Sequence, residues 1–465
     1  MSGAPTGQAT APVSTDTAVV RALRRIRVPQ TQRNRELGLL IFAFLINGSA
    51  VALVQLGAIG AIDWTFLVYC GGLTALVIAL HIVLRLRVRA ADPFVVPIAT
   101  LLTGVGLAMI YRLDLAADRH GWNAFSTRQL AWAAIALIAA IAVVLFLKNY
   151  RVLFRYTYIF GFVGIALLVL PIIPGLSGGG NADVWVDVGF FTFQPGELAK
   201  ISLAIFFAGY LVRTRESLTS TGTRFLGITW PRGRELGPLL VIWLVSLGII
   251  VLQRDLGTGV LIFGMFVAML YVATGKTSWV LIGVVLAVSG AFLASRVLPY
   301  VGARFTNWLD AFNPARMDNE SFQLVNGLFG MAHGGLIGTG LGQGRPYLTP
   351  VSESDYILPA LGEELGLVGV FAILALYMVF TSRGIRIGLA GQDDFGKLLA
   401  TGLSFTIALQ VFIMVGGVTR IIPLTGLTTP FLAAGGSSLV ANWIIVALLL
   451  RISDAVRSRP RVVIG

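Results

Sequence analysis

Long apolar runs separated by short polar segments dominate the chain from residue 37 to residue 450. Each run is close to the ~20 residues that an α-helix needs to cross the hydrocarbon layer of a membrane. Helix is the expected conformation because backbone polar groups inside lipid must be satisfied within the chain. A transmembrane β-barrel would need alternating polarity over about ten residues, and the run AWAAIALIAAIAVVLF has none. The pattern therefore predicts an all-α polytopic membrane protein.

The apolar runs predict about twelve transmembrane helices. They are expected near 37–58, 65–84, 93–111, 129–147, 153–172, 194–212, 237–253, 257–274, 279–296, 357–380, 398–416 and 432–450. Residues 1–36 are polar and basic without apolar periodicity, which predicts a flexible tail, and residues 454–465 form a short second tail. The longest segment between two spans is predicted to be a large loop, 298–356.

The distribution of basic residues predicts the orientation, because cytoplasmic loops of membrane proteins carry the excess of Lys and Arg. With these spans, 25 of the 35 basic residues lie on the side of the N-terminus. Both tails are therefore predicted to be cytoplasmic, and loop 298–356 extracytoplasmic. The cytoplasmic loops are too short for a soluble domain that would bind ATP or a nucleotide sugar. Any chemistry is expected on the outer side of the cytoplasmic membrane.

Composition agrees with this prediction, since 56% of the residues are apolar and 12% are charged, against about 25% charged residues in soluble domains. The net charge of +13 would suggest a nucleic-acid partner for a soluble protein. Here the basic residues cluster between spans, where anionic lipid headgroups attract them, so the membrane is the expected partner and nucleic acid is not. The single cysteine, Cys70, excludes a disulfide framework and a cysteine metal site within the chain.

Three other patterns carry little functional weight. ATGKTS lacks the glycine that a phosphate loop needs five positions before Gly275, and it follows an apolar run instead of a strand. GLIGTGLGQG has glycine spacings like those of dinucleotide folds, but no strand-turn-helix unit surrounds it, so a flexible or tightly turning outer loop is expected. The three histidines are too scattered for a zinc site, while metal binding through carboxylates stays open.

Two motifs place charged residues inside predicted spans. FQPGELAK puts Glu197 and Lys200 on one face at the start of a helix, and GEELG puts Glu363 and Glu364 in the first turns of another. Ionisable residues within a span are costly and usually face a cavity or the interior of the helix bundle. The first pair forms either a functional polar interior or an ion pair that only aligns helices. For the second pair, either one of the two glutamates faces the same polar interior, or both lie near the headgroups without a chemical role.

QRDLGT joins two apolar runs with almost no loop, which predicts that Asp255 lies at or just below the outer membrane surface. The aspartate is either a solvated turn residue or a carboxylate partly withdrawn from water. A carboxylate of the second kind has a raised pKa and can serve as a general base. Spacing alone does not decide between the two.

Five segments, in this order and spacing, resemble the signature segments of the SEDS (shape, elongation, division and sporulation) family. They are FQPGELAK, QRDLGTGVLIF, GGLIGTGLGQG, SDYILPALGEELGLVG and TGLTTPFLAAGGSSL. The resemblance covers residues 92–453 and implies a ten-helix membrane core, to which the two helices of residues 37–91 are added. These additional helices and the short C-terminal tail are most similar to the elongation members of actinobacteria.

The resemblance implies a peptidoglycan glycosyltransferase that polymerises lipid II on the outer face of the membrane and releases undecaprenyl diphosphate. It also implies a class B penicillin-binding protein transpeptidase as partner. No cofactor is implied with certainty, and a divalent cation stays open. Alternatives from other classes are a lipid II flippase, a scaffold that only binds other wall-synthesis proteins, and, within the family, a division polymerase.

The resemblance assigns Asp255 as the catalytic residue and Glu197 with Lys200 as a buried ion pair. Arg128, in STRQLAW, matches a basic position near the diphosphate. Arg254 and Lys200 are further candidates for that cationic role, and Asp355, Glu363 and Glu364 complete the polar candidates. The chain departs from the family pattern at QRD for QPD, at QPGE for QPSE, and at Ala433 and Ala434 for Ser-Tyr. The Arg254 departure leaves the backbone geometry beside Asp255 in doubt.

Overall fold

The computed structural model describes residues 26–27, 32–173, 184–187, 189, 192–219, 224–225, 228–229, 237–458 and 461–462. Most of the predicted N-terminal tail, and parts of the C-terminal tail and of the segments 174–191 and 220–236, lie outside the described residues. In the described part of the chain, ten helices are long and apolar enough to cross a membrane. They are α2 (Arg33–Ile59), α3 (Trp64–Arg87), α4 (Val95–Ala116), α5 (Phe125–Phe146), α8 (Pro195–Thr219), α10 (Leu256–Thr274), α11 (Ser278–Val297), α15 (Ile357–Leu389), α16 (Asp394–Val418) and α17 (Gly436–Arg457).

Two shorter apolar helices occupy the remaining predicted spans. They are α7 (Thr157–Val169), continued by η2 (Leu170–Ile172), and α9 (Gly237–Gln253). All twelve predicted apolar runs are therefore helical, and the prediction of an all-α polytopic membrane protein is confirmed. The described strands are all two residues long: β1 (Ile26–Arg27) pairs with β6 (Arg461–Val462), β2 (Val186–Asp187) with β3 (Thr192–Phe193), and β4 (Arg224–Phe225) with β5 (Ile228–Thr229).

The helices form a central group and a peripheral group. In α4, 89% of the residues of the most apolar segment are buried, whereas the corresponding share in α11 is 17%. α8, α10, α16 and α17 resemble α4 in burial, while α2, α3 and α15 resemble α11. Lipid replaces water around the peripheral helices, so their many exposed apolar side chains are expected on a membrane-facing surface.

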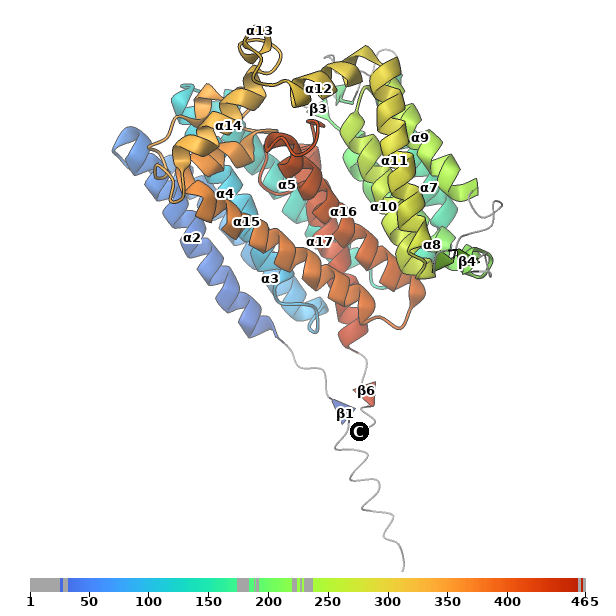
Figure 1. Cartoon of the computed structure of the whole chain (residues 1–465). Helices are drawn as coiled ribbons and strands as arrows, with labels where there is room; N and C mark the ends of the chain where they lie inside the picture. The colour runs from blue at the N-terminus through green and yellow to red at the C-terminus, as the bar shows by residue number, and fades with distance from the viewer. Residues whose placement is uncertain are drawn as a thin grey trace, which may run out of the picture.

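The loop 298–356 is built from short helices that gather at one end of the bundle. They are α12 (Pro299–Leu309), α13 (Pro314–Met317), α14 (Phe322–Gly334) and η4 (Pro346–Leu348). Figure 1 shows α12, α13 and α14 at the end opposite to β1 and β6, which lie near the chain termini. The GLIGTGLGQG segment turns tightly there: Gly338 has a φ of 92°, and a Cβ on it would lie 2.3 Å from the Glu364 carbonyl oxygen. Only glycine fits such a position.

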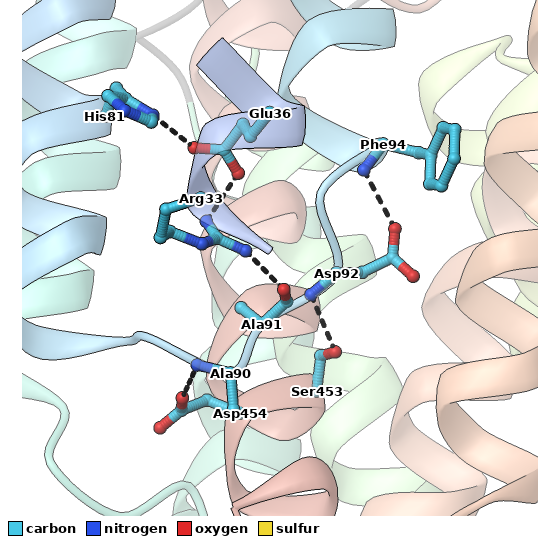
Figure 2. A network of polar contacts seen from close by, with 9 residues as sticks. All are labelled: Arg33, Glu36, His81, Ala90, Ala91, Asp92, Phe94, Ser453 and Asp454. Carbon is cyan, nitrogen blue, oxygen red and sulfur yellow. Dashed lines mark hydrogen bonds and ion pairs between the residues drawn. The ribbon is translucent and has the colours of Figure 1, made fainter. Parts of the chain in front are cut away.

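A buried polar network joins the first two helices to the core at the end of the bundle that carries the termini (Figure 2). Glu36 lies 2.5 Å from Nη1 of Arg33 and 2.7 Å from Nδ1 of His81, so α2 and α3 are joined to each other. Arg33 also donates to the carbonyl of Ala91, in the segment that leads from α3 to α4. This network fixes the α2–α3 hairpin at one end.

The same segment is attached to the last core helices. The Asp92 carboxylate forms ion pairs with Arg383 of α15, at 2.8 Å, and with Arg457 of α17. Its backbone N–H donates to Ser453 Oγ at 3.0 Å, and the Ala90 N–H donates to the Asp454 carboxylate at 2.8 Å (Figure 2). Buried charges persist when they are paired and hydrogen-bonded, as here.

Candidate active site

Asp255 lies in the break between α9 and α10, at the end of the bundle that carries α12. Its Oδ1 accepts a hydrogen bond from the Thr258 backbone N–H at 3.0 Å, so the aspartate caps the first turn of α10. The preceding residue, Arg254, has a φ of 55°, in the left-handed region that non-glycine residues rarely adopt. Proline has a fixed φ near about −65° and could not adopt this conformation. The QRD turn of this chain therefore has a backbone conformation at position 254 that the proline of a QPD turn could not adopt.

The surroundings of Asp255 give its carboxyl the protonation behaviour of a base. The residue is half-buried, and the loss of water around the carboxyl raises its pKa above the ordinary value of 3.8. Hydrogen bonds from Thr258 and the positive charge of Arg304, on α12, partly oppose this rise. A carboxylate with a raised pKa binds a proton more readily than a solvated aspartate, as a general base requires.

Arg304 stands between two carboxylates. Its charge lowers the pKa of Asp255 and also that of Asp355, which directly precedes α15. Burial outweighs this effect and raises the pKa of Asp355 to about 6, with the charge of Asp255 raising it further. Nη1 of Arg304 donates to the carbonyl of Leu424 at 3.1 Å, and a Cβ on Gly426 would lie 3.9 Å from both Arg304 and Asp355. Asp255, Arg304, Asp355 and the segment 419–435 therefore form one site.

Asp355 gives a stability prediction with a defined sign. Between pH 3.8 and about 6 the folded protein keeps a proton that the unfolded chain has lost, so the stability falls as the pH rises through this window. Asp355→Asn removes that cost, and at pH 7 it is expected to raise the unfolding free energy by roughly 1 to 3 kcal/mol. Near pH 4 the variant and the wild type are expected to unfold at similar temperatures. Thermal unfolding in detergent at several pH values measures the difference, and a shift of equal size at pH 4 and pH 7 contradicts the prediction.

Glu197 and Lys200 form the predicted ion pair, at 2.5 Å, with side chains that are 6% and 2% exposed. Lys200 Nζ also donates to Gln410 Oε1 on α16 at 3.0 Å, and it lies 3.4 Å from Asn442 Oδ1 on α17 as a second amide acceptor. Lys200 is thus held by one ion pair and two hydrogen bonds to amide oxygens. These contacts join α8 to α16 and α17, so Lys200 holds the three helices together, while its role as a cation for a diphosphate stays a prediction.

The partners of Lys200 hold the segment 419–435. Gln410 donates to the Thr428 carbonyl at 2.8 Å, and Asn442 donates to Ser438 Oγ at 3.2 Å, which in turn lies 3.2 Å from the Thr428 hydroxyl. The start of α8 is also close to the Asp255 turn, since a Cβ on Gly196 would lie 3.9 Å from Thr258. The ion pair thus orders the elements that surround Asp255.

Arg128 lies on α5, near the end of the segment 419–435. Its guanidinium is 4.5 Å from the centre of the Phe125 ring, and its buried Nε has no hydrogen-bond partner within the described residues. The neighbouring Gln129 donates to the Ala433 carbonyl at 3.1 Å and accepts from the Gly435 N–H at 3.2 Å. Arg128 therefore keeps donor capacity for an anion, whereas Arg254 is exposed beside Asp255.

Glu363 and Glu364 belong to another cluster. Glu363 accepts from the Arg345 N–H at 2.8 Å, and Glu364 accepts from the Gly342 N–H at 2.9 Å. Glu364 also forms an ion pair with Arg112 of α4 at 3.1 Å. These contacts fix the glycine-rich turn to α15 and α4. No described contact joins this pair to Asp255, and its role toward the substrate stays a prediction.

Arg304 and Gln410 are site residues that the sequence reasoning missed. Arg304 lies on α12, and the sequence predicts that segment only as part of the long loop 298–356. Gln410 lies in an apolar run, where an uncharged polar residue gave a weaker signal than Lys200. In the described part of the chain, no group of three or more His, Cys, Asp or Glu side chains could hold a metal ion.

Comparison with known proteins identifies the family. Residues 93–458 match the FtsW, RodA and SpoVE family, described as "Cell cycle protein". The chain belongs to this SEDS family. It is 44% identical over 439 residues to the peptidoglycan glycosyltransferase RodA of Mycobacterium tuberculosis (H37Rv), with 93% of each chain covered. It is 34% identical to stage V sporulation protein E of Bacillus subtilis (strain 168), with 78% of this chain and 96% of that chain covered.

Solved structures of SEDS proteins share the fold. A chain from a structure described as a peptidoglycan synthase complex aligns with a TM-score of 0.63 at 23% identity, covering 79% of this chain and 98% of that chain. The Thermus thermophilus rod shape determining protein RodA aligns with a TM-score of 0.54 at 22% identity, covering 78% and 97%. The family match begins at residue 93, after α3, whereas the mycobacterial match covers 93% of the chain.

Proposed function

We propose that this chain is a peptidoglycan glycosyltransferase of the elongation type, which polymerises lipid II and releases undecaprenyl diphosphate. The observation that carries the proposal is the half-buried Asp255, with its raised pKa, beside Arg304 at the end of the bundle that holds loop 298–356. Relatives that cover nearly the whole chain at 44% identity are named peptidoglycan glycosyltransferase RodA, which supports the elongation role over the division role.

The proposed reaction needs one base and several cations. Asp255 takes the proton from a hydroxyl group of the acceptor sugar, and the hydroxyl oxygen forms a bond to the anomeric carbon of the donor. The bond from that carbon to the diphosphate breaks, and its electron pair leaves with the diphosphate. Attack opposite the leaving group inverts the anomeric carbon. The leaving diphosphate needs charge stabilisation, for which Arg304, Arg128 and Arg254 are the proposed cations.

Purified protein incubated with fluorescent lipid II tests the activity directly. A ladder of glycan polymer on a gel is the expected result. Movement of lipid II across a vesicle membrane without polymer would instead support a flippase and overturn the proposal. We include a divalent cation in the proposal only to stabilise the charge of the leaving diphosphate. Its candidate ligands are Asp255 and Asp355. Removal of cations with EDTA, followed by addition of Mg²⁺ or Mn²⁺, tests it.

We propose that the end of the bundle with Asp255 faces the cell exterior and that both termini are cytoplasmic. The excess of basic residues on the other side supports this orientation. In a Cys70→Ser background, Asn319→Cys, in loop 298–356, is expected to react with an impermeant thiol reagent in intact cells. Gln392→Cys, between α15 and α16 at the opposite end, is the matched exposed control and should react only after lysis. The reverse pattern would contradict the orientation.

We propose a class B penicillin-binding protein transpeptidase as the membrane partner. The support is the fold shared with a chain of a peptidoglycan synthase complex, in which polymerisation and crosslinking are coordinated. Co-purification in mild detergent is expected to recover the transpeptidase, and lipid II polymerisation should be faster in its presence. Equal polymerisation rates with and without the partner would remove activation from the proposal.

A further inference from the structure

The α2–α3 hairpin is held at both ends. At the terminal end it is fixed by the network around Glu36 (Figure 2). At the other end Gln55 donates to the Asp63 carbonyl at 3.2 Å, and the Tyr111 hydroxyl of α4 donates to the Asp63 carboxylate at 3.3 Å. There α2 also meets the glycine-rich turn, since a Cβ on Gly57 would lie 2.5 Å from the Leu341 carbonyl oxygen. The position of the hairpin on the core is therefore fixed.

Between these two attachments the hairpin and the core enclose a cavity of about 200 Å³. It is lined by α2, α3, α4, α5 and α17, mostly by apolar side chains such as Phe44, Leu67, Val77, Leu107 and Leu137. A single water needs about 10 to 15 Å³ by this measure, so the cavity has room for much more than one water. None of the lining residues is charged, which excludes a charged headgroup as its preferred content.

Three polar atoms of the lining residues have no hydrogen-bond partner among the residues that the structure describes: Asn47 Oδ1, Thr100 Oγ1 and Trp443 Nε1. Thr100 is 6% exposed and Trp443 is 1% exposed. Asn47 is oriented by its own amide, which donates to the Thr100 carbonyl at 3.0 Å. A buried polar group without a partner costs about 1 to 3 kcal/mol, and three such groups around one cavity indicate a ligand that satisfies them.

The chemistry of the three atoms selects the polar group of the ligand. The Asn47 oxygen needs a donor, the Trp443 N–H needs an acceptor, and the Thr100 hydroxyl can be either. A hydroxyl group donates one hydrogen bond and accepts two, so an alcohol offers both the donor and the acceptors that these three atoms lack. A carbonyl oxygen could not serve Asn47, and an ionised group would be desolvated without a counter-charge.

The cavity opens towards the bilayer between α2 and α3. Gly48 of α2 and Gly71 of α3 line it and are exposed, and a Cβ on either residue would meet nothing within 4 Å. These two glycines leave open space beside the cavity, where a chain from the surrounding lipid could enter. The mouth and the apolar lining fit an alkyl or isoprenyl chain, and the three polar atoms fit its hydroxyl group.

We propose that this cavity is a binding site for a neutral lipid with a single hydroxyl group, held between the N-terminal hairpin and the core. The hydroxyl hydrogen bonds to Asn47, Thr100 and Trp443, while the chain fills the apolar part and leaves between Gly48 and Gly71. The site is separate from Asp255 and does not depend on the proposed glycosyltransferase activity.

Photolabelling of the full chain in phosphatidylcholine nanodiscs tests the site. The probes are a diazirine-bearing hexadecanol and the matching diazirine-bearing hexadecane, which has no hydroxyl group. The alcohol is expected to crosslink to peptides of α2 and α3 that line the cavity, and the alkane to label lipid-facing helices without this preference. Excess unlabelled hexadecanol should compete if the site takes a single-chain alcohol, and dioleoylglycerol should compete if it takes a diacyl lipid.

Variants of the mouth and of the polar lining complete the test. Gly71→Leu or Gly48→Leu is expected to block cavity labelling, whereas Gly72→Leu, on the same helix and equally open but outside the cavity lining, is the matched control and should label normally. Trp443→Phe removes one hydrogen bond and should weaken alcohol labelling about fivefold. Equal cavity labelling by alcohol and alkane, unchanged labelling in both mouth variants, or competition by neither lipid would overturn the proposal.

The unfolding temperature, measured with and without hexadecanol, tests the site independently of labelling and is useful for a variant that is obtained in low yield. Hexadecanol is expected to raise the unfolding temperature of the wild type and of Gly72→Leu, and to have a smaller effect on Trp443→Phe. Without the alcohol, Thr100→Val should be as stable as the wild type or more stable, since it removes an unpaired hydroxyl group. No alcohol-dependent shift in the wild type, with water alone filling the cavity, would overturn the proposal.

Discussion

Asp255→Asn is expected to abolish lipid II polymerisation while the protein stays folded in the membrane. The substitution keeps the shape of the side chain, and an amide oxygen can still accept the Thr258 N–H bond that caps α10. It removes the basicity that the acceptor hydroxyl requires, which typically contributes about 10²- to 10⁴-fold. The initial rate of polymer formation measures the effect, and binding of labelled lipid II should remain.

Two controls separate loss of the base from general damage. Asp318→Asn removes a carboxylate from an exposed position at the same end of the bundle and should polymerise at the wild-type rate. The unfolding temperature of Asp255→Asn should be equal to or above that of the wild type, because burial of the charge disfavours its ionised form. A near wild-type rate for purified Asp255→Asn would exclude this residue as the base, and Asp355 would be the next carboxylate to test.

Lys200→Ala is expected to lose both activity and stability. The substitution leaves the Glu197 carboxylate buried without its partner and removes the hydrogen bond to Gln410. Breaking a buried ion pair by removing one member costs about 3 to 5 kcal/mol in soluble proteins. The unfolding temperature in detergent should fall clearly, and polymerisation should fall because Gln410 holds Thr428 in the segment that surrounds Arg304.

A charge-neutral double variant separates the two effects of Lys200. Lys200→Met with Glu197→Gln removes both charges and should recover much of the lost stability, because no unpaired charge remains. Activity should stay low, since methionine cannot donate to Gln410 or Asn442. Recovery of full activity in the double variant would show that Lys200 acts only by neutralising Glu197. Unchanged stability in Lys200→Ala would contradict the importance of the pair.

The membrane helices were predictable because lipid imposes a length and an apolar composition on every spanning helix. All twelve predicted spans are helical, including the short α7 and α9. The ion pair between Glu197 and Lys200 was also predictable. Charges inside a span need partners, and residues at positions i and i+3 lie on the same face of a helix. Such local rules say little about contacts between distant segments.

The site around Asp255 is formed by contacts between segments that lie far apart in the sequence. Arg304 reaches Asp255 and Asp355 only because α12 folds back over the end of the bundle, and no local pattern encodes that direction. The position of Glu363 and Glu364 in the first turns of a span predicts that they belong to the same polar interior, but it does not predict their contacts. Their carboxylates satisfy backbone N–H groups of a glycine-rich turn, whose tight course could not be placed on α15 from spacing.

The left-handed backbone at Arg254 has an evolutionary consequence. A residue with positive φ in front of the proposed base cannot be exchanged for proline without rebuilding the turn, because the proline ring requires a negative φ. The turn geometry and the choice of residue at position 254 are therefore linked, because this turn excludes proline. Restoring the family consensus one residue at a time, a common strategy for engineering stable variants, should fail at this position even though it imports the commoner residue.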